Sequence, residues 1–151
     1  MTMRCRCAAV VACGVWALLA PAIQGRDGQA VPQYTAPSGR SYAALPDTAG
    51  VVAKARARAE AEPDSVEAQL ALGDAWAAIW NHLEALAVYD RILARDPRHA
   101  LALQQRGHRQ LSIRRFARAR SDLERAVALD PSLTDAYYYL GLLEYLDGRY
   151  L

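Results

Sequence analysis

Three histidines are the side chains of this sequence best suited to acid-base chemistry or metal binding. His82 falls in a predicted turn, His99 in a predicted loop and His108 on a predicted helix, so we expect no shared metal site. Asp74 and His108, on adjacent helices, are a conceivable acid-base pair. No serine or cysteine nucleophile lies in a catalytic motif. The sequence therefore predicts no enzyme, no catalytic residues, no bound metal and no cofactor.

The cysteines are confined to the start of the chain. Cys5, Cys7 and Cys13 are the three in the sequence, so the remainder has no thiol for disulfides, metal ligation or nucleophilic attack. The residues before Cys13 also resemble a lipobox, which would attach a lipid there and tether the protein to a membrane. Most of the apolar run follows Cys13 instead of preceding it, so we keep lipidation only as an alternative.

Residues 1–25 have the layout of a secretory signal peptide. Arg4 and Arg6 precede an apolar run at 8–20, and Ala20-Pro21-Ala22 is a small-residue cleavage site. The run has about 13 residues, whereas ~20 are needed to cross the hydrocarbon of a bilayer. We expect cleavage and an exported protein, periplasmic or extracellular. A retained leader, acting as a membrane tether, is the alternative.

The charge balance argues against nucleic acid as a partner. The chain has 18 basic and 16 acidic residues, and removing the leader with Arg4 and Arg6 leaves 16 of each. Proteins that bind nucleic acid usually present a clearly basic face. We therefore expect neither DNA nor RNA as a partner, and a membrane only if the leader is retained.

Residues 26–46 are expected to form a flexible tether. The segment mixes Gly, Pro, Ser and Gln without a helical period, and Pro37 and Pro46 disfavour a regular helix. Tyr34 and Tyr42 are placed to dock on the helices that follow.

From residue 47 the sequence is repetitive and predicts an all-α fold. Ala, Leu and Arg dominate, and all three favour helix. Prolines 63, 97 and 131 are spaced by 34 residues, as are glycines 73, 107 and 141. We expect helices near 48–61, 65–79, 82–95, 99–112, 116–129 and 133–147. The glycines should lie where the two helices of a hairpin cross closely.

The residues at fixed positions of each repeat resemble the tetratricopeptide repeat (TPR). The first repeat has Leu72-Gly73, Trp76, Ala85, Tyr89 and Asp96-Pro97; the second has Gly107, Phe116, Ala119, Leu123, Ala126 and Asp130-Pro131; the partial third has Tyr137, Leu140-Gly141, Gly148 and Tyr150. The resemblance covers Val66 to Leu151. It implies that residues 47–151 form an α-solenoid of two full repeats and a partial third, preceded by one capping helix.

The resemblance also implies a function, because the first helices of successive TPR hairpins usually line an inner groove that holds a peptide or partner helix. Carried onto this sequence, the groove consists of Glu67, Leu70, Asp74, Ala78, Leu101, Gln104, His108, Leu111, Ser112, Asp135, Tyr138, Leu142 and Tyr145. We therefore expect a protein-protein interaction scaffold. The alternative is that these residues are merely solvated or packed against neighbours, because solenoids also bind through edges and loops.

The first of two departures from a regular array is an arginine at a mostly buried position; the second lies in the last predicted helix. Arg106 stands where the family usually has leucine, so its guanidinium must reach solvent or pair with a carboxylate. It belongs to an arginine-rich stretch at 106–125, in which we expect internal ion pairs on a solvated face; a grip on an acidic partner is the alternative.

The last predicted helix carries tyrosines 137–139 with Leu143 and Leu146, which should leave an apolar face uncovered. That face suggests self-association through the C-terminal helix. The same face would also be uncovered in a truncated fragment of a longer TPR protein with no independent function. A membrane-tethered assembly factor is a further interpretation, which the leader would support if it is retained.

Overall fold

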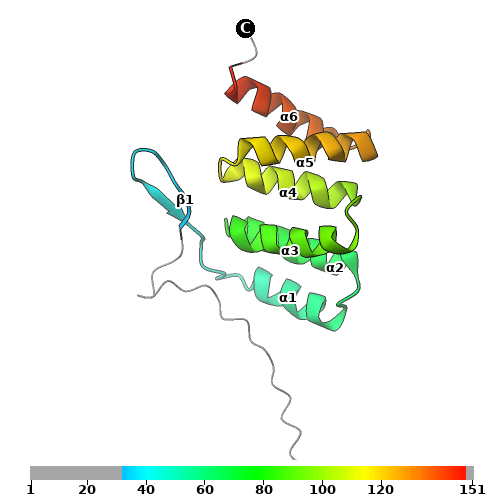
Figure 1. The fold of residues 1–151 in the computed structure, drawn as a ribbon. Helices are drawn as coiled ribbons and strands as arrows, with labels where there is room; N and C mark the ends of the chain where they lie inside the picture. The colour runs from blue at the N-terminus through cyan, green and yellow to red at the C-terminus, as the bar shows by residue number, and fades with distance from the viewer. Residues whose placement is uncertain (1–31, 149–151) are drawn as a thin grey trace, which may run out of the picture.

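The computed structural model describes residues 32–148, which form a β-hairpin followed by a stack of helices (Figure 1). The strands are β1 (Pro32–Thr35) and β2 (Ser41–Ala43); the helices are α1 (Val51–Ala61), α2 (Val66–Ala78), α3 (His82–Arg95), α4 (Ala100–Ser112), α5 (Phe116–Leu129) and α6 (Thr134–Leu146). The predicted all-α solenoid is confirmed for the repeat region. Each helix has its predicted bounds within one residue, except that α1 begins three residues late. The expected signal peptide at 1–25 lies outside the described residues.

The helices pack as sequential antiparallel neighbours. α2 pairs with α3 and α4 with α5, while α1 packs on α2, α3 on α4 and α5 on α6. α4 also contacts α6 directly, so the first helices of these two repeats adjoin. The core is built from alanines and a few large side chains, of which Tyr89, Leu103, Leu123 and Leu143 are fully buried. Each pair thus covers apolar surface of the next, as a repeat array requires.

Two glycines permit the close crossing within each hairpin. A Cβ on Gly73 of α2 would lie 2.5 Å from Cε1 of Tyr89 on α3, and one on Gly107 of α4 would lie 2.8 Å from Cγ of Leu123 on α5. Carbon atoms in contact normally stay about 3.5–4.0 Å apart. The prediction that small residues are needed at these crossings is confirmed.

The turn between the two helices of each hairpin has the same backbone form. The Trp80 N–H donates to the carbonyl of Ala77 and the Asn81 N–H to that of Trp76, which is the Schellman arrangement, and the turn after α4 repeats it. Its left-handed position is occupied by Trp80 (φ 61°) and Arg114 (φ 63°). Gly148 (φ 70°) lies 34 residues further on. A side chain in this conformation costs roughly 1–2 kcal/mol relative to glycine.

The hairpin corrects the prediction of a flexible tether at 26–46, at least for residues 32–43. Tyr34 pairs with Tyr42 across the strands, their rings 6.2 Å apart, and the connecting turn closes at Gly39 (φ 82°). The side chain of Gln33 accepts a 2.8 Å hydrogen bond from the Leu83 N–H in the first turn of α3. Cross-strand ring contact and this long-range bond hold a segment whose strands are too short to show a period in the sequence.

Candidate functional site

The predicted groove residues come from α2, α4 and α6, and most of them reach the surface. Exposed members are Glu67, Asp74, Ala78, Leu101, Ser112, Asp135, Tyr138 and Tyr145, and half-buried members are Leu70, His108 and Leu142. We call the exposed and half-buried members together the first-helix surface. Two predicted members, Gln104 and Leu111, are instead buried. The reason is that α4 packs against α3, α5 and α6 at once, which buries most of its circumference.

A cluster of polar side chains connects the late turns of α2 and α4 with α3. The Tyr89 hydroxyl donates to Oδ1 of Asp74 at 2.7 Å, so one oxygen of the predicted acid-base partner of His108 is already bonded. His108 Nδ1 contacts a terminal nitrogen of Arg109, and its ring stacks on Tyr139 of α6 with centroids 4.0 Å apart. The first contact joins α2 to α3, and the ring stack joins α4 to α6 and engages His108 structurally.

The histidines are closer together than the sequence predicted. His82 begins α3 and His108 lies near the end of α4; because these helices run antiparallel, the two side chains share one environment with Arg109. Burial, and then the Arg109 charge, lower the pKa of His82 to about 4. Burial, Arg109 and His82 do the same to the pKa of His108. Both imidazoles are therefore neutral near pH 7. His99 stands apart, because its Nδ1 accepts from the Ala102 N–H and caps α4.

Arg109 is the cation at the centre of this cluster. Burial lowers its pKa, opposed by the hydroxyls of Tyr89 and Tyr139 and the carboxylate of Asp74. Within residues 32–148 it forms no ion pair, and its buried Nε has no hydrogen-bond partner. A half-buried, incompletely bonded guanidinium beside neutral imidazoles is suited to binding an anion.

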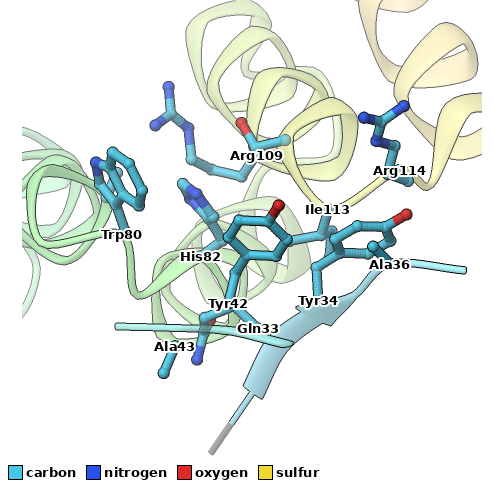
Figure 2. Close-up of a pocket in the computed structure, with 12 residues that line it drawn as sticks. Gln33, Tyr34, Ala36, Tyr42, Ala43, Trp80, His82, Arg109, Ile113 and Arg114 are labelled. Atoms are coloured by element: carbon cyan, nitrogen blue, oxygen red, sulfur yellow. The ribbon is translucent and has the colours of Figure 1, made fainter. Parts of the chain in front are cut away.

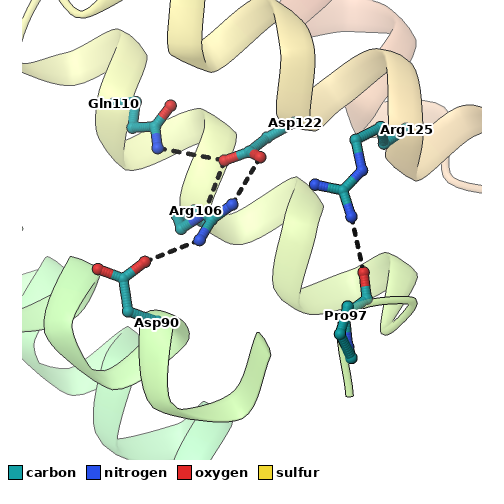
Figure 3. Close-up of polar contacts among 6 residues, drawn as sticks. All are labelled: Asp90, Pro97, Arg106, Gln110, Asp122 and Arg125. Carbon is teal, nitrogen blue, oxygen red and sulfur yellow. Dashed lines mark hydrogen bonds and ion pairs between the residues drawn. The ribbon is translucent and has the colours of Figure 1, made fainter. Parts of the chain in front are cut away.

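Two other arginines of the 106–125 stretch, Arg106 and Arg120, form the internal ion pairs that the sequence predicts, and Figure 3 shows the contacts of Arg106. Arg106 binds Asp122 of α5 through two 2.7 Å hydrogen bonds and Asp90 of α3 through one of 2.8 Å. Arg120 pairs with Glu144 and with Asp147. Of the two outcomes expected for Arg106, solvent or a carboxylate, the structure shows the carboxylate.

The apolar surface expected on the last helix is uncovered only in part. Tyr137, Tyr138, Tyr145 and Leu146 of α6 are 49%, 68%, 69% and 44% exposed, whereas Leu143 is fully buried. Exposed aromatic side chains are enriched at contact surfaces between proteins.

A cavity of about 560 Å³ lies between the β-hairpin and the turns of the array, and the sequence did not predict it (Figure 2). We call it the hairpin pocket. It is lined by Gln33, Tyr34, Ala36, Tyr42, Ala43, Ala77, Trp80, His82, Arg109, Ser112, Ile113 and Arg114. The Arg114 guanidinium lies 5.8 Å from the centre of the Tyr34 ring, which attaches the hairpin to the turn after α4. Of the two hairpin tyrosines expected to dock on the helices, Tyr34 thus contacts the array at this turn.

Two other kinds of site are absent from the part of the chain that the structure describes. No helix between residues 32 and 148 is long and apolar enough to span a membrane. In the same region, no three side chains among His, Cys, Asp and Glu are grouped as a metal site would require.

Comparison with known proteins gives matches over the helical array. A family model described as tetratricopeptide repeat matches residues 49–100 and 105–151. A crystal structure of MamA is similar with a TM-score of 0.59 and 29% identity, covering 68% of this chain and 60% of that one. A second MamA crystal structure gives 0.58 and 29%, covering 68% and 56%. The chain thus spans less than two thirds of either MamA chain. Comparison with curated proteins finds no match.

Proposed function

Because the chain belongs to the tetratricopeptide-repeat family, we propose that it is a protein-interaction scaffold with no catalytic chemistry of its own. The partner segment is a peptide or helix that lies along the first-helix surface. The site of action is outside the cytoplasm, in the periplasm or the extracellular space.

The observation that carries the proposal is the composition of the first-helix surface. Leu101, Tyr138 and Tyr145 are 38%, 68% and 69% exposed there, and aromatic groups of this kind commonly anchor a partner. Glu67 and Asp135, which belong to the same surface, are also exposed. An amphipathic segment that carries apolar and basic side chains would complement both features.

Export is supported by the leader at 1–25, with its two arginines, apolar run and small-residue cleavage site. Expression of the full chain in the native host, followed by intact mass measurement, tests this part. We expect loss of the leader and recovery from the exported fraction. An unprocessed chain in the cytoplasmic fraction would contradict export without affecting the binding proposal.

The binding proposal is tested by capture of the partner from the exported fraction. The test variant changes exposed residues on which no core hydrogen bond depends: Glu67→Lys, Leu101→Ser and Tyr138→Ser. The control changes Arg91, Ala94 and Glu124, which are exposed on α3 and α5. We expect the control to recover the partner as the unmodified chain does and the test variant to lose it. Equal recovery of the partner by both variants would show that the first-helix surface does not bind it.

A second candidate function, self-association through α6, is favoured by its exposed apolar side chains. Tyr137 and Leu146 are two of these exposed side chains and lie outside the first-helix surface; they are nine positions apart and point to opposite sides of the helix, so changing both covers both sides. Sedimentation velocity over a range of concentrations should show a dimer that Tyr137→Ser and Leu146→Ser together abolish. An unmodified chain that stays monomeric at every concentration would end this candidate.

A further inference from the structure

The two non-glycine residues in left-handed conformation face the same pocket. Trp80 and Arg114 occupy equivalent turn positions, and Gly148 shows that glycine serves at the next one. Both side chains line the hairpin pocket (Figure 2). Backbone strain of this kind persists where the side chain has a use, and such positions cluster at ligand sites. We therefore expect that the use of these two side chains lies in the pocket and not in forming the turns.

The charges that line the pocket are of one sign. Arg109 and Arg114 contribute guanidiniums, and no lining residue that the structure describes is acidic. Two buried nitrogens at this site, Nε of Arg109 and Nδ1 of His82, lack hydrogen-bond partners within the described chain. The described chain therefore leaves the polar bonding of Arg109 and His82 incomplete at this site.

The remaining wall is aromatic. Figure 2 shows the rings of Tyr34 and Tyr42 on the hairpin side of the pocket, and Trp80 with Arg109 on the side of the array. Asp74 lies near enough to Arg109 to offset part of its charge. The positive charge that remains in the pocket after this offset suits a monoanion better than a doubly charged phosphate group.

We propose that the hairpin pocket binds a carboxylate group carried on an aromatic or apolar body. Arg109 pairs with the carboxylate, Arg114 adds positive charge at the turn, and Trp80 with the two hairpin tyrosines packs against the body. A volume of about 560 Å³ accommodates a small organic acid or the last residues of a peptide. This site shares only Ser112 with the first-helix surface, so carboxylate binding goes beyond the proposed scaffold function. The carboxylate proposal can be refuted while the scaffold proposal stands.

Calorimetric titration of the purified chain with two carboxylates and their amides tests the proposal. Phenylacetate represents a free small acid and N-acetyl-Ala-Phe represents a peptide C-terminus; phenylacetamide, N-acetyl-Ala-Phe-amide and inorganic phosphate are the controls. We expect one or both carboxylates to bind and the matched amides to bind at least roughly tenfold more weakly, because the amides lack the charge. Binding of the peptide alone identifies a protein terminus as the source, and binding of phenylacetate identifies a small acid.

Variants separate ligand binding from folding. Arg109→Gln should weaken carboxylate binding at least roughly tenfold, whereas Arg118→Gln, an exposed arginine of α5 outside the pocket, should leave it unchanged. Trp80→Gly should weaken binding while its urea midpoint stays equal or rises, because glycine relieves the left-handed strain. The proposal is overturned if neither carboxylate binds at millimolar concentration, if the amides bind equally well, if phosphate binds more tightly, or if Arg109→Gln binds normally.

Discussion

Replacing Arg106 with leucine should destabilise the fold, although leucine is the usual residue at this position of the repeat. The Arg106 side chain is 20% exposed and donates two 2.7 Å hydrogen bonds to the two oxygens of Asp122, whose side chain is 6% exposed. Its third bond goes to Asp90, whose side chain is 61% exposed and returns to water if released. The cost of the substitution therefore arises at Asp122.

The magnitude follows from what happens to that carboxylate. Gln110 continues to donate a 3.1 Å hydrogen bond to Asp122, but no cation remains bonded to it. Removing one partner of a buried ion pair costs about 3–5 kcal/mol. We expect the lower end, about 3 kcal/mol, because Arg106 is partly solvated in the folded chain. That is a large share of the roughly 5–15 kcal/mol by which a domain is usually stable.

Urea unfolding followed by circular dichroism measures this loss. The double variant Arg106→Leu with Asp122→Leu should recover at least half of it, because no charge is then left buried. Arg58→Ala is the matched control: its pair with Glu62 is about half exposed on both sides, so its loss should cost less than about 0.5 kcal/mol. If Arg106→Leu unfolds at the same urea concentration as the unmodified chain, the assigned role of this ion pair is wrong.

Two further perturbations probe packing and protonation. Gly73→Ala should lower the free energy of unfolding by about 1–3 kcal/mol, because the new Cβ meets the Tyr89 ring at 2.5 Å. Adding Tyr89→Leu should make the alanine tolerable. A double-mutant cycle in urea measures the coupling between the two positions. Stability should fall as the pH drops from about 6.5 towards 4, because the folded chain holds the pKa of His82 and of His108 at about 4 while the unfolded chain takes up both protons. The double His→Gln variant should show a shallower fall.

Each of these expectations has its own contradiction. Additive effects of the Gly73 and Tyr89 substitutions on stability would show that contact with Tyr89 is not the reason glycine is needed at position 73. Titrating carboxylates contribute to the acid slope of both chains, so only the difference between them reports on the histidines. Parallel pH profiles would mean that the histidines are solvated in the folded state.

The helical array could be predicted because its information is local and repeated. Prolines and glycines at a 34-residue period fixed the helix bounds, and the small residues at 73 and 107 had one steric purpose. Pairing of Arg106 was predictable as a class, since a buried guanidinium needs a carboxylate. Its partners, Asp122 and Asp90, required the actual packing of α4 between two other helices.

What escaped prediction depended on contacts between distant segments. The hairpin consists of strands of four and three residues, too short for an alternating pattern, and its link to α3 spans 50 residues through Gln33. The proximity of His82 and His108 follows from the antiparallel course of α3 and α4, which linear spacing does not show. One signal was available: Trp80 and Arg114 stand in repeat positions where Gly148 stands later, which marks both turns as unusual.

Site-specific photocrosslinking in the native host tests the central claim, binding through the first-helix surface, most directly. A benzophenone side chain placed at Ala78 or Leu101 on that surface is compared with one at Ala94 or Ala128, which are exposed on α3 and α5. We predict that the two first-helix positions crosslink the same partner protein and that the other two do not. Crosslinks of equal yield from all four positions, or from α3 and α5 alone, would contradict the account.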